Sequence, residues 1–133
     1  MALDDKRPSV YPTLRYADAD ADAAIAFLTD AFGLTLGEVS RGPDGTVKHA
    51  ELGWGNGVIM LGTGSDPPGP FDGGPVTLYL AVEDPDAHHD RAVAAGAEIV
   101  MPLTDQPYGS REYAATDTEG NSWSFGTYQP ELP

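Results

Sequence analysis

The stretch VTLYLAVEDPDAHHDRAVAAG, Val76–Gly96, decides the fold because it joins an expected strand directly to an expected helix. Residues 76–82 form a run of apolar and strand-favouring side chains. Asp84-Pro85 then provides a helix N-cap followed by a first-turn proline, and Gly96 provides the stop. The stretch therefore predicts a strand followed by a short helix.

The same order is expected near the N-terminus. Residues 9–16 predict a strand, and the acidic cluster at residues 18–22 provides caps and first-turn acids for a helix that Gly33 ends. Gly33 and Gly96 lie 63 positions apart, which is close to half of the 133 residues. We therefore expect an internal duplication.

Three further strands are expected after each helix, separated by turns rich in Gly, Pro, Asn and Asp. In order, these strands are residues 34–41, 46–53 and 58–61, and then 97–103, 111–116 and 121–127. The chain thus predicts an α+β fold of duplicated βαβββ modules, whose curved mixed sheets surround a cleft. We expect a single domain over residues 1–133, with module one at 8–63, a linker at 64–75 and module two at 76–128.

The composition excludes several functional classes. Seven Lys and Arg residues against 21 Asp and Glu give a net charge of −14, which disfavours nucleic-acid and anionic-membrane partners. The charge favours a cationic or neutral small ligand, or serves solubility alone. Without cysteine the chain has no disulfide, thiolate metal site or cysteine nucleophile. The charged N-terminus and the absence of an apolar run of about 18 residues predict a cytoplasmic protein.

Several segments of both modules resemble the vicinal oxygen chelate superfamily. These segments are YPTLRYAD at 11–18, AIAFL at 24–28, AFG at 31–33, LAVED at 80–84, AGA at 95–97 and DTEGNSW at 117–123. That superfamily includes glyoxalase I, bleomycin-resistance proteins, fosfomycin-resistance transferases and extradiol dioxygenases. The resemblance covers nearly the whole chain and implies its fold.

The resemblance also implies where a divalent metal would bind. The matching positions are Tyr11, Glu51, Thr77 and Ser124, so three of the four carry a hydroxyl where the enzymes of the superfamily carry a metal ligand. We therefore expect no cofactor. The alternative is a divalent metal held by His49 and Glu51, which are two apart on an expected strand and share a face. The pair also suits an ordinary hydrogen bond in a polar pocket, or acid–base catalysis.

Aromatic and hydroxyl side chains that alternate along the expected strands favour a small-molecule pocket. The ligand-binding residues that we expect are Tyr11, Thr13, His49, Glu51, Thr77, Tyr79, Tyr108, Arg111, Tyr113 and Ser124. Arg111 suits a ligand carboxylate or phosphonate, and it equally suits neutralising a neighbouring acid such as Glu51 or Glu112. We assign Phe27, Phe32, Trp123 and Phe125 to the core.

These features favour a metal-independent protein that binds an antibiotic or aromatic metabolite, similar to bleomycin-resistance proteins. The alternative is a metal-dependent lyase, isomerase or dioxygenase similar to glyoxalase I, in which His49 and Glu51 are catalytic. A third alternative is a structural or interaction dimer. The expected partners are a cationic or aromatic small molecule and a second copy of the chain, as is usual in this superfamily.

Overall fold

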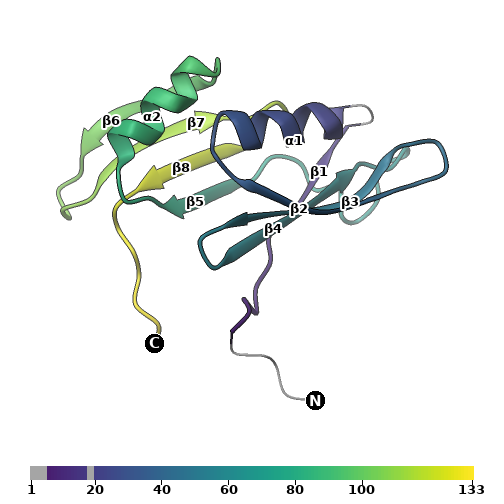
Figure 1. Ribbon diagram of the computed structural model, residues 1–133, viewed down its shortest axis with the longest axis horizontal. Coiled ribbons are helices and arrows are strands. Elements are labelled where there is room, and N and C mark those ends of the chain that lie inside the picture. The colour runs from purple at the N-terminus through teal and green to yellow at the C-terminus, as the bar shows by residue number, and fades with distance from the viewer. Residues whose placement is uncertain (1–5, 18–19) are drawn as a thin grey trace. The chain divides into compact units, whose positions relative to one another are not determined.

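The computed structural model describes residues 6–17 and 20–133, and Figure 1 shows their arrangement. In the first half the elements are β1 (Thr13–Tyr16), α1 (Asp20–Asp30), β2 (Thr35–Arg41), β3 (Val47–Trp54) and β4 (Gly57–Thr63). In the second half they are β5 (Thr77–Ala81), α2 (Pro85–Ala94), β6 (Glu98–Asp105), β7 (Arg111–Thr116) and β8 (Ser122–Gly126). The expected βαβββ order is confirmed in both halves. Asp18, an expected helix cap, lies outside the described residues.

The second helix begins as its sequence predicts. The Asp84 side chain accepts a hydrogen bond of 3.0 Å from the backbone N–H of Ala87, and Pro85 occupies the first turn. Gly96 follows the helix in a left-handed conformation (φ 87°), which glycine adopts without steric cost. With 11 and 10 residues, α1 and α2 are both too short to span a membrane.

The chain divides into two compact units. The first contains the described residues up to Thr29 together with Leu34–Gly74, and the second contains Asp30–Gly33 and Pro75–Pro133. The boundary at Gly74 lies within the segment 64–75 that the sequence predicts as a linker.

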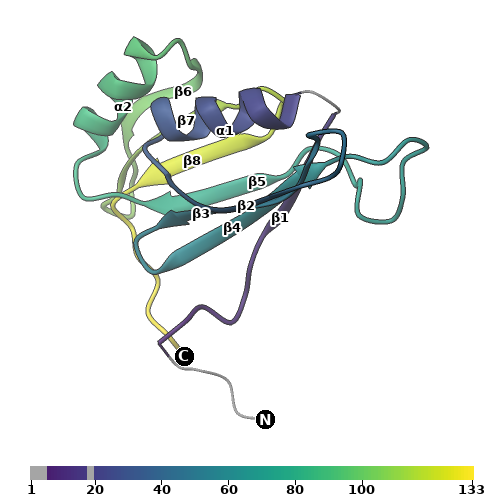
Figure 2. The ribbon, with the colours of Figure 1, turned by 45° about the vertical axis from the view of Figure 1, so that its right-hand side comes forward.

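The first unit contains a four-stranded sheet in the order β1-β4-β3-β2, visible in Figure 2. β1 is parallel to β4, and the other pairs are antiparallel. Register shifts between β2 and β3 mark irregularities that bend a sheet. One face is buried, with Leu14, Tyr16, Ala50, Leu52 and Leu61 each at most 3% exposed. The opposite face, which we call the first open face, carries the alternate residues of the same strands.

The second unit repeats this sheet in the order β5-β8-β7-β6, again with a parallel pair between the first two strands. Figure 1 shows α2 lying across β6 and β7, with which it is in contact. The face towards α2 holds a fully buried aromatic core of Phe32, Tyr113, Trp123 and Phe125. Phe32 lies 4.9 Å from Phe125 and 5.5 Å from Trp123 between ring centroids. The core assignment is confirmed for Phe32, Trp123 and Phe125, whereas Phe27 stays partly exposed.

Candidate functional site

The first open face brings together four polar side chains from two strands. Thr13 and Arg15 belong to β1, and His49 and Glu51 belong to β3. Thr13 and Glu51 are both in register with Met60 of β4, so they point to the same side of the sheet. The register therefore places three of the expected ligand-binding residues, Thr13, His49 and Glu51, on one surface.

His49 and Glu51 form a hydrogen-bonded pair on this surface. The Nε2 atom of His49 lies 2.8 Å from Oε2 of Glu51, and the two side chains are 39% and 40% exposed. Their expected placement on one face of a strand is confirmed. A half-exposed imidazole beside a carboxylate can accept or donate a proton at a bound molecule.

Tyr11 lies outside β1, although the sequence predicts a strand over residues 9–16. β1 begins at Thr13, because Pro12 has no N–H to donate to a ladder. Tyr11 lies before the strand and is 38% exposed. The Pro12 carbonyl still accepts a hydrogen bond of 2.9 Å from the N–H of Met60, which holds this lead-in segment beside β4.

The second open face lies on the side of the second sheet away from α2. Tyr79 of β5 is in register with Ser124 of β8, which is in register with Ala114 of β7. Thr77 shares the face because it is two residues from Tyr79. Thr77 and Tyr79 are exposed, and Ser124 is partly exposed. The structure thus brings these three expected ligand-binding residues together on one surface.

The expectation that Tyr113 binds a ligand is wrong. Tyr113 is fully buried on the face covered by α2, where its hydroxyl contacts Nδ1 of His88 at 2.5 Å. Burial raises the pKa of Tyr113, because the phenolate would be desolvated. Its ring stacks on Phe125 at 5.1 Å. Tyr113 is therefore part of the core rather than a surface for ligands.

Arg111 neutralises two neighbouring acids of its own unit, Asp86 and Asp105. Its Nη2 atom lies 2.9 Å from Asp86 of α2, and its Nη1 atom lies 3.1 Å from Asp105 of β6. These hydrogen bonds raise the pKa of Arg111. Glu112, in the same unit, forms no ion pair with Arg111 in the described part of the chain. The Arg111 guanidinium, which could bind a carboxylate of a ligand, is thus already paired with two carboxylates of the protein.

Two residues of the second open face escape the sequence reasoning, namely Glu112 and Tyr128. Glu112 is only 6% exposed, and its Oε1 atom accepts a hydrogen bond of 2.7 Å from the Tyr108 hydroxyl. This hydrogen bond raises the pKa of Tyr108 to about 12. The backbone carbonyl of Tyr128 accepts a hydrogen bond of 2.6 Å from Tyr79. Strand alternation could have identified Glu112. Adjacent residues of a strand point to opposite faces, so a core position for Tyr113 places Glu112 on the open face.

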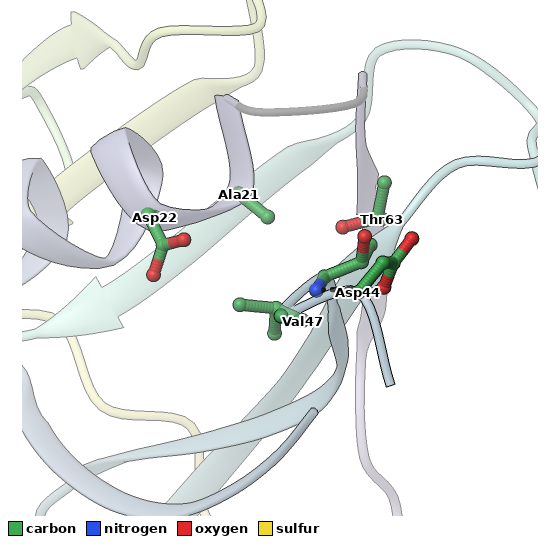
Figure 3. A pocket seen from close by; sticks show the side chains of 7 residues that line it. Ala21, Asp22, Asp44, Val47 and Thr63 are labelled. Atoms are coloured by element: carbon green, nitrogen blue, oxygen red, sulfur yellow. Dashed lines mark hydrogen bonds between the residues drawn. The ribbon is translucent and has the colours of Figure 1, made fainter. Parts of the chain in front are cut away.

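The first unit also contains a cavity of about 220 Å³, shown in Figure 3. Its lining residues are Ala21, Asp22, Asp44, Gly45, Thr46, Val47 and Thr63. Asp22 pairs with Arg41 at 2.8 Å, which fixes the first turn of α1 beside β2. Within the described residues, the Thr63 hydroxyl oxygen is buried and has no hydrogen-bond partner. Nothing in the sequence reasoning predicted this cavity.

The residues at the implied metal positions do not fit a divalent ion. Tyr11, Thr77 and Ser124 offer neutral hydroxyls, and Glu51 offers the only carboxylate among the four. Divalent transition metals in proteins are normally held by three or more imidazole, carboxylate or thiolate groups. Across residues 6–17 and 20–133, no group of three such side chains is close enough together to hold a metal. His49 and Glu51 together therefore offer only two groups that could bind a metal ion.

Comparisons with known proteins agree with this architecture. An uncharacterized protein of Mycobacterium bovis is 40% identical over 116 residues, which cover 80% of this chain and 76% of that protein. The crystal structure of TioX from Micromonospora sp. ML1 is 35% identical, with a TM-score of 0.72, over 95% of this chain and 100% of that one. Lactoylglutathione lyase from Agrobacterium tumefaciens is 25% identical, with a TM-score of 0.63, over 90% and 93% of the two chains.

A family profile extends over the two repeated modules. The profile of the Glyoxalase/Bleomycin resistance protein/Dioxygenase superfamily matches residues 11–125, which contain every strand and helix except the last residue of β8. The duplicated βαβββ order, the two mixed sheets and this match lead to one conclusion: the chain belongs to the glyoxalase/bleomycin resistance protein/dioxygenase superfamily.

Proposed function

We propose that the chain is a small-molecule-binding protein that captures an aromatic or cationic ligand without a metal ion. The observation that carries this proposal is the replacement of metal ligands by hydroxyl groups at Tyr11, Thr77 and Ser124. Hydroxyl groups hydrogen-bond a ligand well, but they hold a divalent ion poorly when neutral. Bleomycin-resistance proteins, which the family description names, match this mode of action.

The chemistry of the open faces supports a ligand with a flat or amphipathic body. Tyr79 is 39% exposed beside Ser124, and Thr13 lies on the same sheet face as Glu51 in the first unit. A tyrosine offers an apolar ring with a polar tip, and neighbouring hydroxyls fix the orientation of a bound molecule. The net charge of −14 attracts basic ligands over a range of several ångströms.

Equilibrium titration against basic antibiotics and aromatic metabolites tests this proposal. We expect quenching of intrinsic fluorescence with micromolar affinity for at least one compound, and a loss of about tenfold in affinity in Tyr79→Ala. Val100→Ala is the matched control, because Val100 is 51% exposed on an outer strand of the same sheet. Flat titrations across the whole panel would contradict the proposal.

A metal-dependent or acid–base enzyme is the second candidate function. The 2.8 Å pair of His49 and Glu51 favours it, because Glu51 can act as a general base that His49 assists. The likeness to a lactoylglutathione lyase points the same way. Metal content is measured by mass spectrometry after incubation with zinc, nickel, iron or manganese. One retained metal per chain, lost in His49→Ala and Glu51→Ala, would favour the enzyme.

The proposal includes a homodimer as its assembly state. Size-exclusion chromatography with light scattering at several concentrations measures the mass in solution. A mass of about twice 14.0 kDa is expected for the purified protein. A mass of one chain at every concentration would contradict this part of the proposal.

A further inference from the structure

We propose that Glu112 and the tyrosines Tyr79, Tyr108 and Tyr128 form a binding site for a positively charged nitrogen group of the ligand. The site lies on the second open face and is built from residues of one unit. The inference rests on the proposed function, and it names the chemical class that this surface recognises, an alkylammonium or aromatic ammonium ion.

The Glu112 carboxylate is buried and lacks a cationic partner in the described residues. Glu112 is only 6% exposed, and its Oε1 atom accepts one hydrogen bond, from the Tyr108 hydroxyl. Within residues 6–17 and 20–133, no other hydrogen bond and no ion pair reaches this carboxylate. Buried carboxylates are ordinarily paired with a cation, because desolvation of the charged group is costly. Glu112 therefore offers its second oxygen to a cation that the described chain does not supply.

Three tyrosines of the same unit lie close to one another on this surface. The Tyr108 and Tyr128 rings meet edge to face at 6.2 Å, and the Tyr79 hydroxyl donates to the Tyr128 carbonyl at 2.6 Å. Tyr79, Tyr108 and Tyr128 are 39%, 62% and 52% exposed, so their side chains are accessible to a ligand. Aromatic faces attract cations through the ring quadrupole, and aromatic groups around an acid are a common design for ammonium ligands.

Gly126, which is in register with Glu112, leaves space for the Glu112 side chain. A Cβ atom at Gly126 would meet the Cγ atom of Glu112, and it would lie 2.8 Å from the Tyr79 hydroxyl and 3.0 Å from Oε2 of Glu112. The glycine thus lets the Glu112 side chain lie across β8 towards Tyr79. In this position the carboxylate accepts the hydrogen bond from Tyr108 and lies on the same side of Gly126 as the Tyr79 hydroxyl.

The charges nearby do not replace the missing cation. Arg111, the adjacent residue, points to the opposite face and is held by Asp86 and Asp105. The pKa of Tyr108 is raised to about 12, so its hydroxyl stays protonated and keeps donating to Glu112. Desolvation raises the pKa of Tyr79, and the nearby Glu112 charge adds to this effect. Both phenols therefore remain neutral hydrogen-bond donors.

A matched set of small probes tests the charge preference. Benzylammonium, benzyl alcohol and benzoate share one ring and differ mainly in charge, and their binding is followed by NMR shifts of the tyrosine ring signals. We expect benzylammonium to bind at least tenfold more tightly than benzyl alcohol, and benzoate to leave the signals of Tyr79, Tyr108 and Tyr128 unchanged. Glu112→Gln should remove the preference, whereas Glu98→Gln, an exposed acid on β6 of the same sheet, should retain it.

Two further variants keep the test informative if Glu112→Gln is unstable. Tyr128→Ala removes a ring that is 52% exposed, and it should weaken benzylammonium binding about fivefold. Gly126→Ala should weaken it further by displacing the carboxylate. Thermal unfolding of each variant reports whether the fold is kept.

The outcomes separate this inference from the proposed function. Equal affinity for benzylammonium and benzyl alcohol, or an unchanged preference in Glu112→Gln, would overturn the cation site even if the antibiotic panel shows binding. A Glu112-dependent preference with a flat antibiotic panel would uphold the cation site and contradict the proposed function. A preference lost equally in Glu98→Gln would overturn the site, because general attraction by the acidic surface would then explain it.

Discussion

His88 and Tyr113 are joined at 2.5 Å between the imidazole Nδ1 and the phenolic oxygen, inside the aromatic core of the second unit. The other ring nitrogen, Nε2, lies 2.7 Å from the Phe32 carbonyl, to which it donates. Nδ1 is then the acceptor of the neutral ring, and Tyr113 donates its proton to it. Phe32 and Tyr113 are far apart in sequence, so His88 connects two segments of the unit by hydrogen bonds.

This arrangement predicts a stability that depends on pH. Burial lowers the pKa of His88 below 6.5, and the charge of Arg91 adds to the effect. The unfolded chain therefore binds a proton where the folded chain does not, and the free energy of unfolding falls as the pH drops below about 6.5. Urea denaturation at several pH values measures the slope. His88→Gln should flatten it, and His89→Gln should not; an equal slope in His88→Gln would contradict the prediction.

Asp117 should be essential for the last hairpin. Its buried carboxylate accepts hydrogen bonds from the Trp123 indole N–H at 2.9 Å, from Asn121 Nδ2 at 3.0 Å and from the Glu119 backbone N–H at 2.9 Å. Asp117→Ala leaves these donors unpaired, so we expect a loss of about 3 kcal/mol in the free energy of unfolding. Denaturant titration followed by fluorescence measures it. Thr118→Ala, at an exposed neighbouring position, should cost less than about 0.5 kcal/mol.

Arg111 should matter little for ligand binding. Its pairs with Asp86 and Asp105 are partly exposed, with the Arg111 side chain at 37%, so solvent screening weakens them. We expect Arg111→Gln to leave the free energy of unfolding almost unchanged and to change ligand affinity less than twofold. Calorimetric titration with any compound that the panel identifies checks the affinity. A tenfold loss would show that the guanidinium leaves its acids to bind the ligand.

The Tyr108 hydroxyl should report directly on Glu112. The hydrogen bond to Glu112 raises the pKa of Tyr108 to about 12, since ionisation of the phenol would place two negative charges together. In Glu112→Gln we expect the pKa to fall towards about 10, the value of an ordinary tyrosine. Titration of the ¹³Cζ signal by NMR measures both values. An unchanged titration of Tyr108 would contradict the hydrogen bond.

Local chemistry made much of this protein predictable from its sequence. The Asp84 cap, the Pro85 first turn and the Gly96 stop act through neighbouring atoms, so the second helix could be placed from them alone. The pairing of His49 with Glu51 was equally local, because strand geometry puts residues two apart on the same face. Repetition of these signals indicated the βαβββ duplication.

The choice between the two faces of a strand was decided only by the tertiary structure. Alternation shows that Arg111 and Tyr113 oppose Glu112, but it does not show which side the helix covers. The structure buries Tyr113 against His88 and Phe32 and leaves the charged Glu112 facing outwards, although little of it is exposed. The Glu112 carboxylate is buried because Tyr108 contacts it and because Gly126 leaves room for its side chain. Both residues lie outside β7, the strand that carries Glu112. Sequence therefore determined the elements through short-range interactions, and long-range packing determined which side chains form the site.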